Sequence, residues 1–201
     1  EPVNGVLKLD YSSFKDNNFR LRECKNIGDV EFQSGQIPPY SFYHSSITKL
    51  TLTKDTTGIG EGAFACCYNL KTVDFSADSE FDDDQIGEGA FCNSALDTIL
   101  NFPSNLKIIQ AYTFYGCPLN STSIKTALQL SNSNLETISE KAFYGSNIIF
   151  IQFPTTLTEI EESAFENCKN LEIGGSSIDV STIGPSAFFN SPKVTKIEIT
   201  S

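Results

Sequence analysis

The six residues IGEGAF occur at 59–64 and again, letter for letter, at 86–91. An identity of this length so close along the chain is not expected by chance, and a functional motif is seldom duplicated within so few residues. Internal repetition with a period of 20 to 50 residues is typical of solenoid proteins. This repeat therefore constrains the possible folds more than any other feature of the sequence.

The repeat extends well beyond the two identical copies. In each copy an Ile lies five residues before a Phe, and the spacings between successive Phe residues are 22, 27, 23, 29, 22 and 23. The seven pairs are Ile37/Phe42, Ile59/Phe64, Ile86/Phe91, Ile109/Phe114, Ile138/Phe143, Ile160/Phe165 and Ile183/Phe188. A unit of this size cannot bury its apolar face alone, so stacking of the units must supply the core.

Small side chains accompany each Phe. The residue before it is Ser41, Ala63, Ala90, Thr113, Ala142, Ala164 or Ala187, and the third residue after it is Ser45, Cys67, Ser94, Cys117, Ser146, Cys168 or Ser191. A residue and its third neighbour share one face of a helical turn. We therefore expect each AFxxC segment to form a short helical or 3₁₀ corner, with the ring pointing inward.

An extended segment follows each corner, with apolar residues at L-x-x-I-x-F spacing. Examples are Ile47/Leu50/Leu52, Leu70/Val73/Phe75, Ile148/Ile151/Phe153 and Val194/Ile197/Ile199. The last two positions alternate as in a half-buried strand. Ile27/Val30/Phe32 indicates an earlier, incomplete copy. We expect residues 1–26 to form an N-terminal cap or incomplete repeat, and residues 27–201 to form a solenoid of about seven repeats.

This pattern resembles the BspA-like (Treponema-type) leucine-rich-repeat family, over about residues 27–201. The segment IQFPTTLTEIEESAFENCKNL (151–171) matches nearly the whole family repeat, and LNFPSNLKIIQAYTFYGC (100–117) matches most of it. The departures are Thr113 in place of Ala and Ser in place of Cys in four copies. The resemblance implies an α/β repeat solenoid: a right-handed leucine-rich-repeat superhelix with a parallel sheet on one face and short helical or irregular corners.

The resemblance also implies a function. Similar proteins are largely cell-surface or secreted adhesion proteins that contact host matrix proteins or host cells. We therefore expect a non-catalytic protein-binding module at the cell surface or secreted. The alternative is an intracellular, cytoplasmic scaffold that uses the same face. The chain begins EPVNGV without a Met, so its start looks trimmed and does not decide between the two.

Composition narrows the classes of partner. The 201 residues carry a formal net charge of −11, which argues against nucleic acid and anionic membrane surfaces, since both attract clustered Lys and Arg. No apolar run approaches 18 residues, so we expect no membrane insertion in this segment.

Catalytic, cofactor and metal sites are all predicted to be absent. GEGAFA (60–65) fits a dinucleotide fingerprint, but later copies place Tyr112, Lys141, Ser163 or Ser186 where Gly62 stands. His44 is the only histidine, and the pattern sets no nucleophile beside it. The acidic segment DSEFDDD (78–84) lacks the register of a calcium loop and is interpreted as a solvated insertion.

The six cysteines do not indicate a disulfide framework. Cys67, Cys117 and Cys168 alternate with Ser from repeat to repeat, which places them roughly 10 Å apart, at two strand spacings, whereas a disulfide needs Cα atoms within about 7 Å. We expect these three thiols to be reduced and buried. Asn120, in the sequon NST, is a possible glycosylation site.

Protein binding is expected on the open face of the sheet, whose outward residues are mostly Thr or charged: Lys49, Thr51, Thr72, Asp74, Thr98, Gln152, Lys196 and Glu198. Phe150 breaks this pattern, and by register it also points outward. It is either a binding anchor or is covered by the long insertion before it, and the sequence leaves both open. Tyr43, Tyr115, Tyr144 and Phe189 form a second column, in which Tyr115 and Tyr144 are expected to stack.

Overall fold

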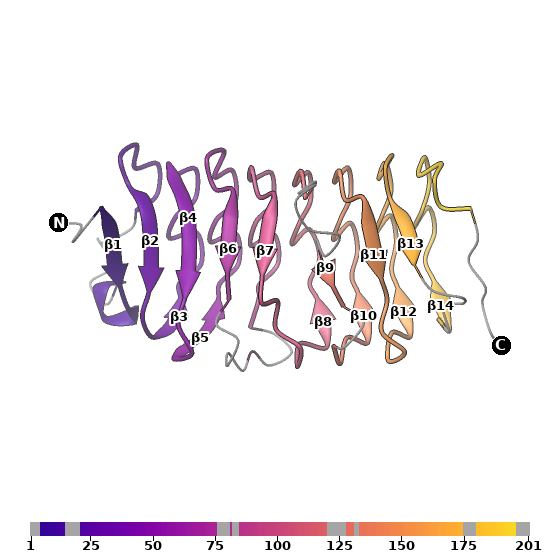
Figure 1. Cartoon of the computed structure of the whole chain (residues 1–201), viewed down its shortest axis with the longest axis horizontal. Coiled ribbons are helices and arrows are strands. Elements are labelled where there is room, and N and C mark those ends of the chain that lie inside the picture. Colours follow the sequence, from indigo (N-terminus) through magenta and orange to yellow (C-terminus); the bar gives the residue numbers. More distant parts are fainter. Residues whose placement is uncertain are drawn as a thin grey trace.

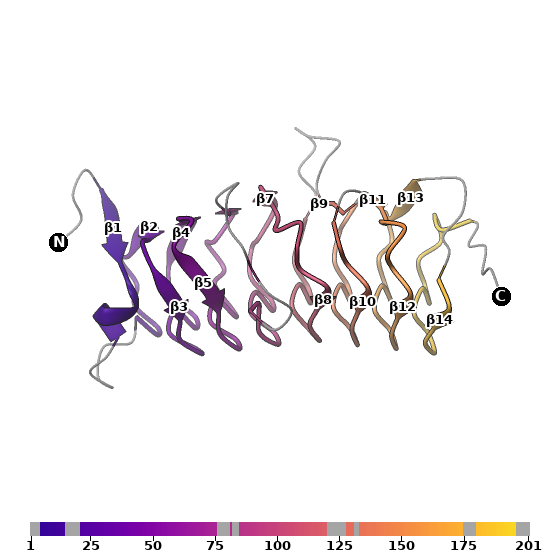
Figure 2. The ribbon, with the colours of Figure 1, turned by 90° about the horizontal axis from the view of Figure 1, so that it is seen from below.

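The chain stacks its repeats along a single axis, with the two termini at opposite ends (Figure 1). The structure is a computed structural model that describes residues 5–14, 21–75, 81, 85–119, 128–130, 133–174 and 180–195. We call one turn of the chain around the axis a rung. Figure 2 shows the long strands along one side of the rungs and the corners along the opposite side.

The long strands form the face that is turned toward the viewer in Figure 1, which we call the front face. They are parallel and are hydrogen-bonded in chain order, apart from a break between β7 and β9. One sheet contains β1 (Val6–Leu9), β2 (Gly28–Phe32), β4 (Ile47–Leu52), β6 (Thr72–Asp74) and β7 (Thr98–Leu100), and a second contains β9 (Leu128–Gln129), β11 (Phe150–Gln152) and β13 (Glu172–Gly174). Alternation along each strand buries every second residue, so Leu50 and Leu52 point inward while Lys49 and Thr51 point outward.

Shorter parallel strands continue each rung at its lower edge. They are β3 (Gly35–Ile37) with β5 (Thr56–Ile59), and β8 (Ile108–Ile109), β10 (Thr137–Ile138), β12 (Glu159–Ile160) and β14 (Thr182–Ile183). A one-turn 3₁₀ helix, η1 (Tyr11–Phe14), is the one helical element within the described residues. The molecule is therefore a parallel β-solenoid with a leucine-rich-repeat-like repeat.

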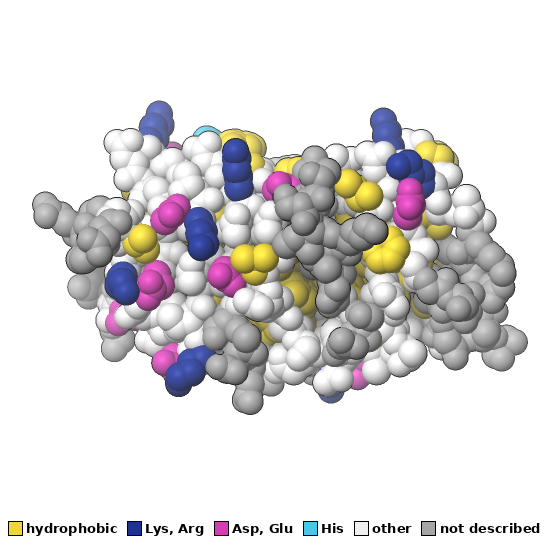
Figure 3. Space-filling view, viewed as in Figure 1, with side chains coloured by type: hydrophobic (Ala, Val, Ile, Leu, Met, Phe, Trp, Pro, Cys, Tyr) yellow, Lys and Arg dark blue, Asp and Glu magenta, His cyan; other side chains and the backbone are white. Residues whose placement is uncertain are grey.

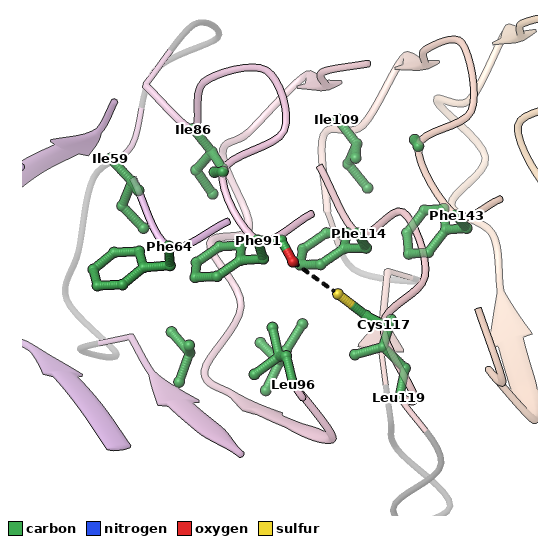
Figure 4. Close-up of a cluster of buried hydrophobic side chains, with 14 of the residues drawn as sticks. Ile59, Phe64, Ile86, Phe91, Leu96, Ile109, Phe114, Cys117, Leu119 and Phe143 are labelled. Carbon is green, nitrogen blue, oxygen red and sulfur yellow. Dashed lines mark hydrogen bonds between the residues drawn. The ribbon is translucent and has the colours of Figure 1, made fainter. Parts of the chain in front are cut away.

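The seven repeat Phe residues form one continuous stack through the core. Successive rings lie 4.9–5.7 Å apart between centroids, with planes within 22° of parallel. Phe64, Phe91, Phe114 and Phe143 are seen in a row in Figure 4, beside Ile59, Ile86 and Ile109 of the preceding Ile column. The ring spacing follows that of hydrogen-bonded strands, about 4.8 Å, so identical rungs must place their rings face to face.

The helical corners predicted from AFxxC are wrong: the corners are successive turns. Each contains two residues with left-handed backbone, two before and two after the Phe, with φ between 52° and 67°. The first set is Tyr40, Gly62, Gly89, Tyr112, Lys141, Ser163 and Ser186, and the second is His44, Cys66, Asn93, Gly116, Gly145, Asn167 and Asn190. A left-handed residue every fourth position is incompatible with a right-handed helix.

Backbone hydrogen bonds of the corner alternate in direction. In the second rung the N–H groups of Tyr40, Phe42 and His44 donate to carbonyls of the next rung at 2.9 Å. The intervening N–H groups of Ser41, Tyr43 and Ser45 donate three residues back within their own rung, at 3.0–3.4 Å. The corner is thus a ladder between rungs that also closes its own turns, which satisfies its backbone polar groups without a helix.

The two glycines of IGEGAF have separate structural reasons. Gly62 has φ 54° and lies under the ring of Tyr40, so an added Cβ would come within 2.4 Å of that ring. Gly60 faces the previous rung, where an added Cβ would lie 2.5 Å from the backbone nitrogen of Pro39. The motif therefore serves turn geometry and close approach of rungs, and the phosphate-binding interpretation is not needed.

The third residue after each Phe forms a column of alternating Ser and Cys. Cys67, Cys117 and Cys168 are buried and carry free thiols, as the alternation predicted. Each Sγ donates to the carbonyl of the Phe in the preceding rung at 3.0–3.1 Å, and Figure 4 marks this bond from Cys117 to Phe91. Each thiol also lies 3.5–3.6 Å from the Ser of that rung.

The same column extends one rung further toward the N-terminus. Glu23 donates its N–H to Tyr43, and Cys24 donates to Leu21, as the matching residues of later rungs do. Leu21 has the backbone position of the Phe and packs against the core, and Cys24 occupies the Ser/Cys position. Phe14 supplies the ring that contacts Phe42 from this end, with centroids 5.9 Å apart. With β1 paired to β2, the described residues before 27, at 5–14 and 21–26, already adopt parts of the backbone pattern of a rung.

Removing one ring from the stack should destabilise the fold strongly. Phe143 is fully buried between Phe114 and Phe165, so Phe143→Ala is expected to lower the free energy of unfolding by about 3–5 kcal/mol in urea titrations. Phe189→Ala is the matched control, because this ring lies outside the stack, on the rung of Phe188, and is 65% exposed, so that its loss should cost less than about 0.5 kcal/mol. An unchanged unfolding curve for Phe143→Ala would contradict the stacked register.

The buried thiols should make stability fall at alkaline pH. Burial raises the pKa of Cys67 and Cys168 to about 11 and that of Cys117 to about 12, from an ordinary 9.0. Above pH 9 the unfolded chain loses these protons while the native state keeps them, so each thiol costs about 1.4 kcal/mol per pH unit until its folded pKa is reached. Below pH 9 the thiols contribute no pH dependence.

The measurement is urea unfolding at neutral and alkaline pH for the natural chain and a Cys67→Ser/Cys117→Ser/Cys168→Ser variant. Serine is the natural occupant of this column on four other rungs, as Ser45, Ser94, Ser146 and Ser191. Tyr and Lys titrate in both proteins. The difference between the two proteins in how steeply the free energy of unfolding falls with pH therefore reports the three thiols alone. Equal slopes in the two proteins would show that the thiols are not buried.

Candidate protein-binding surface

The outward residues of the front strands form two rows across the rungs. One row aligns Asp29, Lys49, Thr72 and Thr98 in β2, β4, β6 and β7, and continues in β11 and β13 with Phe150 beside Glu172. The other aligns Glu31, Thr51, Asp74 and Leu100, and continues with Gln152 beside Gly174. The described residues that were predicted to point outward all lie in these rows.

Charged side chains gather over the N-terminal half of this face (Figure 3), and three of its carboxylates bond to side chains of neighbouring rungs. Lys8 Nζ lies 3.2 Å from Glu31 Oε1, Thr48 donates to Asp29 at 2.6 Å, and Asn101 donates to Asp74 at 3.0 Å. Such exposed pairs contribute little to stability, but they leave the first half of the face well hydrated.

Phe150 places an apolar, partly exposed ring on the C-terminal half of the face. Its ring is 38% exposed, whereas the next residue, Ile151, is fully buried, as the strand alternation predicted. The ring lies over Gly174 on β13, where an added Cβ would come within 2.2 Å of Phe150 Cζ. Gly174 therefore provides the place in which the ring rests on the neighbouring strand, with part of the ring still open to solvent.

Some predicted positions lie outside the described residues. These are Lys196 and Glu198 on the last strand segment, the sequon residue Asn120, and most of the insertion that could cover Phe150. The acidic segment 78–84 also lies outside, apart from Phe81, which is buried in the core against Phe75.

The corner side carries the second aromatic column. Tyr115 and Tyr144 stack as predicted, with centroids 5.0 Å apart and planes at 4°. Beside them, Lys141 Nζ lies 2.5 Å from Glu140 Oε1, and this hydrogen bond lowers the pKa of Glu140 and raises that of Lys141. The Tyr112 hydroxyl joins the pair by donating to Glu140 at 3.2 Å.

His44 is exposed, and its ring contacts are aromatic: Tyr43 at 6.2 Å and Tyr68 at 5.5 Å between centroids. Within the described ranges, no three His, Cys, Asp or Glu side chains are grouped to hold a metal ion. No helix in the same ranges is long and apolar enough to cross a membrane.

One concave site was missed by the sequence reasoning. A pocket of about 350 Å³ opens beside His44, on the turns that lead from the corners into the front strands. The sequence did contain a signal for this pocket, because the number of residues in those turns differs from repeat to repeat.

Comparison with known proteins agrees with the repeat architecture. No curated protein matches the chain. Among solved structures, a leucine-rich repeat protein from Eubacterium ventriosum ATCC 27560 is similar at 18% identity, over 98% of this chain and 74% of that one, with a TM-score of 0.27. The family model for the BspA type leucine-rich repeat region matches residues 7–121 and 84–201 in six copies. The chain therefore belongs to the BspA-type leucine-rich repeat family.

Proposed function

We propose that this domain is a non-catalytic protein-binding module whose partner docks on the front face of the solenoid. Domains of this repeat family are generally associated with protein binding. Candidate contact residues are Lys49, Thr51, Thr72, Asp74, Thr98, Phe150 and Gln152, together with Lys196 and Glu198. They lie on the surface that stacked parallel strands offer as one extended face.

The observation that carries this proposal is the exposed ring of Phe150 in a row of polar and charged residues. Aromatic anchors near the centre of an interface are typical binding hot spots, and their truncation costs about 2 kcal/mol or more. The absence of a side chain at Gly174 leaves a shallow surface beside the ring. A complementary apolar side chain of the partner would pack there.

The proposed setting is the cell surface or the secreted state, with a host matrix or host-cell protein as the partner. Family resemblance supports this setting. A second candidate is an intracellular scaffold that uses the same face. The observation that favours it is that all six cysteines are free, which is typical of reducing compartments.

Truncation of the ring tests the proposed anchor. Phe150→Ala should weaken capture of matrix or cell-surface proteins, or self-association, by roughly thirtyfold, because the ring supplies the desolvated contact. Its melting temperature should fall far less than that of Phe143→Ala, since Phe150 is 38% exposed on the front face whereas Phe143 is fully buried. The readouts are pull-down from matrix and cell-surface extracts, followed by titration of the captured partner, and sedimentation for self-association.

Two further variants sharpen the result. Gly174→Ala should displace the ring from its resting place and change affinity without removing the aromatic group. Phe189→Ala removes an exposed ring from the corner side and should leave binding unchanged. If Phe150→Ala lowers stability and leaves association intact, the ring is part of the fold and the anchor is disproved.

A further inference from the structure

The turn edge, at the top of Figure 1, contains a depression that follows from turn length. The turn edge comprises the residues between the Ser/Cys column and the first apolar residue of each front strand. Ile27 follows Cys24 by three positions and Leu70 follows Cys67 by three, but Ile47 follows Ser45 by only two. The second rung is therefore shorter than both of its neighbours, and its turn lies lower than theirs.

This depression is the pocket of about 350 Å³. Its lining comes from the first rung through Glu23, Cys24 and Lys25, from the second through His44, Ser45 and Ser46, and from the third through Tyr68 and Asn69. The first and third rungs form its walls, and they stand about 10 Å apart, two strand spacings. The pocket is distinct from the front face that carries Phe150.

Two rings shape one side of the pocket. His44 and Tyr68 meet edge to face, with centroids 5.5 Å apart and planes at 84°. Tyr68 is 60% exposed, and the ring contact that it makes beside the pocket is this one with His44. The pocket therefore presents an exposed aromatic surface to solvent.

The polar groups around the rings are of mixed type. Asn69 can both donate and accept hydrogen bonds, Glu23 accepts and Lys25 donates. Arg22 lies 3.5 Å from Glu23, so positive and negative charges are close to balanced at this end of the pocket. The net charge of −11 for the whole chain works against free anions.

We propose that this depression binds one neutral pyranose ring, such as the terminal sugar of a glycan. A pyranose has an apolar C–H face that packs on an aromatic ring, and hydroxyl groups that both donate and accept at its rim. The walls are about 10 Å apart between backbone centres, which leaves about 6 Å after van der Waals contact and accommodates one such ring. An extended peptide of about three residues would already span the distance between the walls. The lining residues of all three rungs lie outside the strands, so they offer no strand edge along which a peptide could pair.

The test is titration of the whole 201-residue chain with methyl glycosides of glucose, galactose, mannose and N-acetylglucosamine, followed by NMR. Saturable binding of at least one of them is expected. Tyr68→Ala should weaken it about tenfold or more, because the stacking surface is lost. Tyr68→Phe should retain it, because the ring face remains. Tyr144→Ala, which removes a tyrosine from a distant rung, should leave binding unchanged.

A second variant tests the pocket by its shape. Insertion of one Gly between Ser46 and Ile47 gives the second rung the turn length of its neighbours and should abolish binding while the melting temperature is retained. Absence of saturable binding up to roughly 20 mM overturns the proposal. Binding that is insensitive to Tyr68→Ala, or that is tighter for N-acetylneuraminic acid or for short peptides, overturns it as well.

Discussion

The backbone hydrogen bonds between rungs are the interaction on which the rest of this structure depends. At the corners every second N–H donates to the next rung, and at the front face the strands do the same. These bonds fix one spacing for the whole chain. Once that spacing is fixed, identical residues must lie above one another, which produces the ring stack and the Ser/Cys column. The core is therefore a consequence of the ladder.

Much of this arrangement could be predicted from the sequence, because a period is visible without coordinates. The inward Phe column, the outward rows with Lys49 and Thr72, and the position of Phe150 all follow from counting residues between repeats. Cys24 could not be assigned in this way, since Leu21 replaces the Phe that serves as the anchor. Only its hydrogen bonds show that it occupies the same column.

The corner conformation and the contacts between rungs escaped prediction for physical reasons. Phe and its third neighbour share a face in a helix and in a pair of turns, so the pattern does not separate the two. Asn93, Asn167 and Asn190 were a usable signal, because Asn tolerates left-handed backbone better than most residues. The packing of Phe150 on Gly174 joins residues of different rungs, and the irregular insertions hide that alignment until the strands are paired.

The unequal turns at the upper edge have a consequence for how such a domain can diversify. A residue gained or lost there changes the shape of the surface, and the neighbouring strands absorb it locally: β2 and β4 shift register between Gly28 and Asp29 and then pair regularly, as β4 and β6 do. A change in the number of residues is thus tolerated in these turns, where it alters only the shape of the surface. It is excluded in the strands and corners, where it would move the core residues out of line. A lineage of these domains could generate new recognition sites by short insertions and deletions at this edge, leaving the inherited interior untouched.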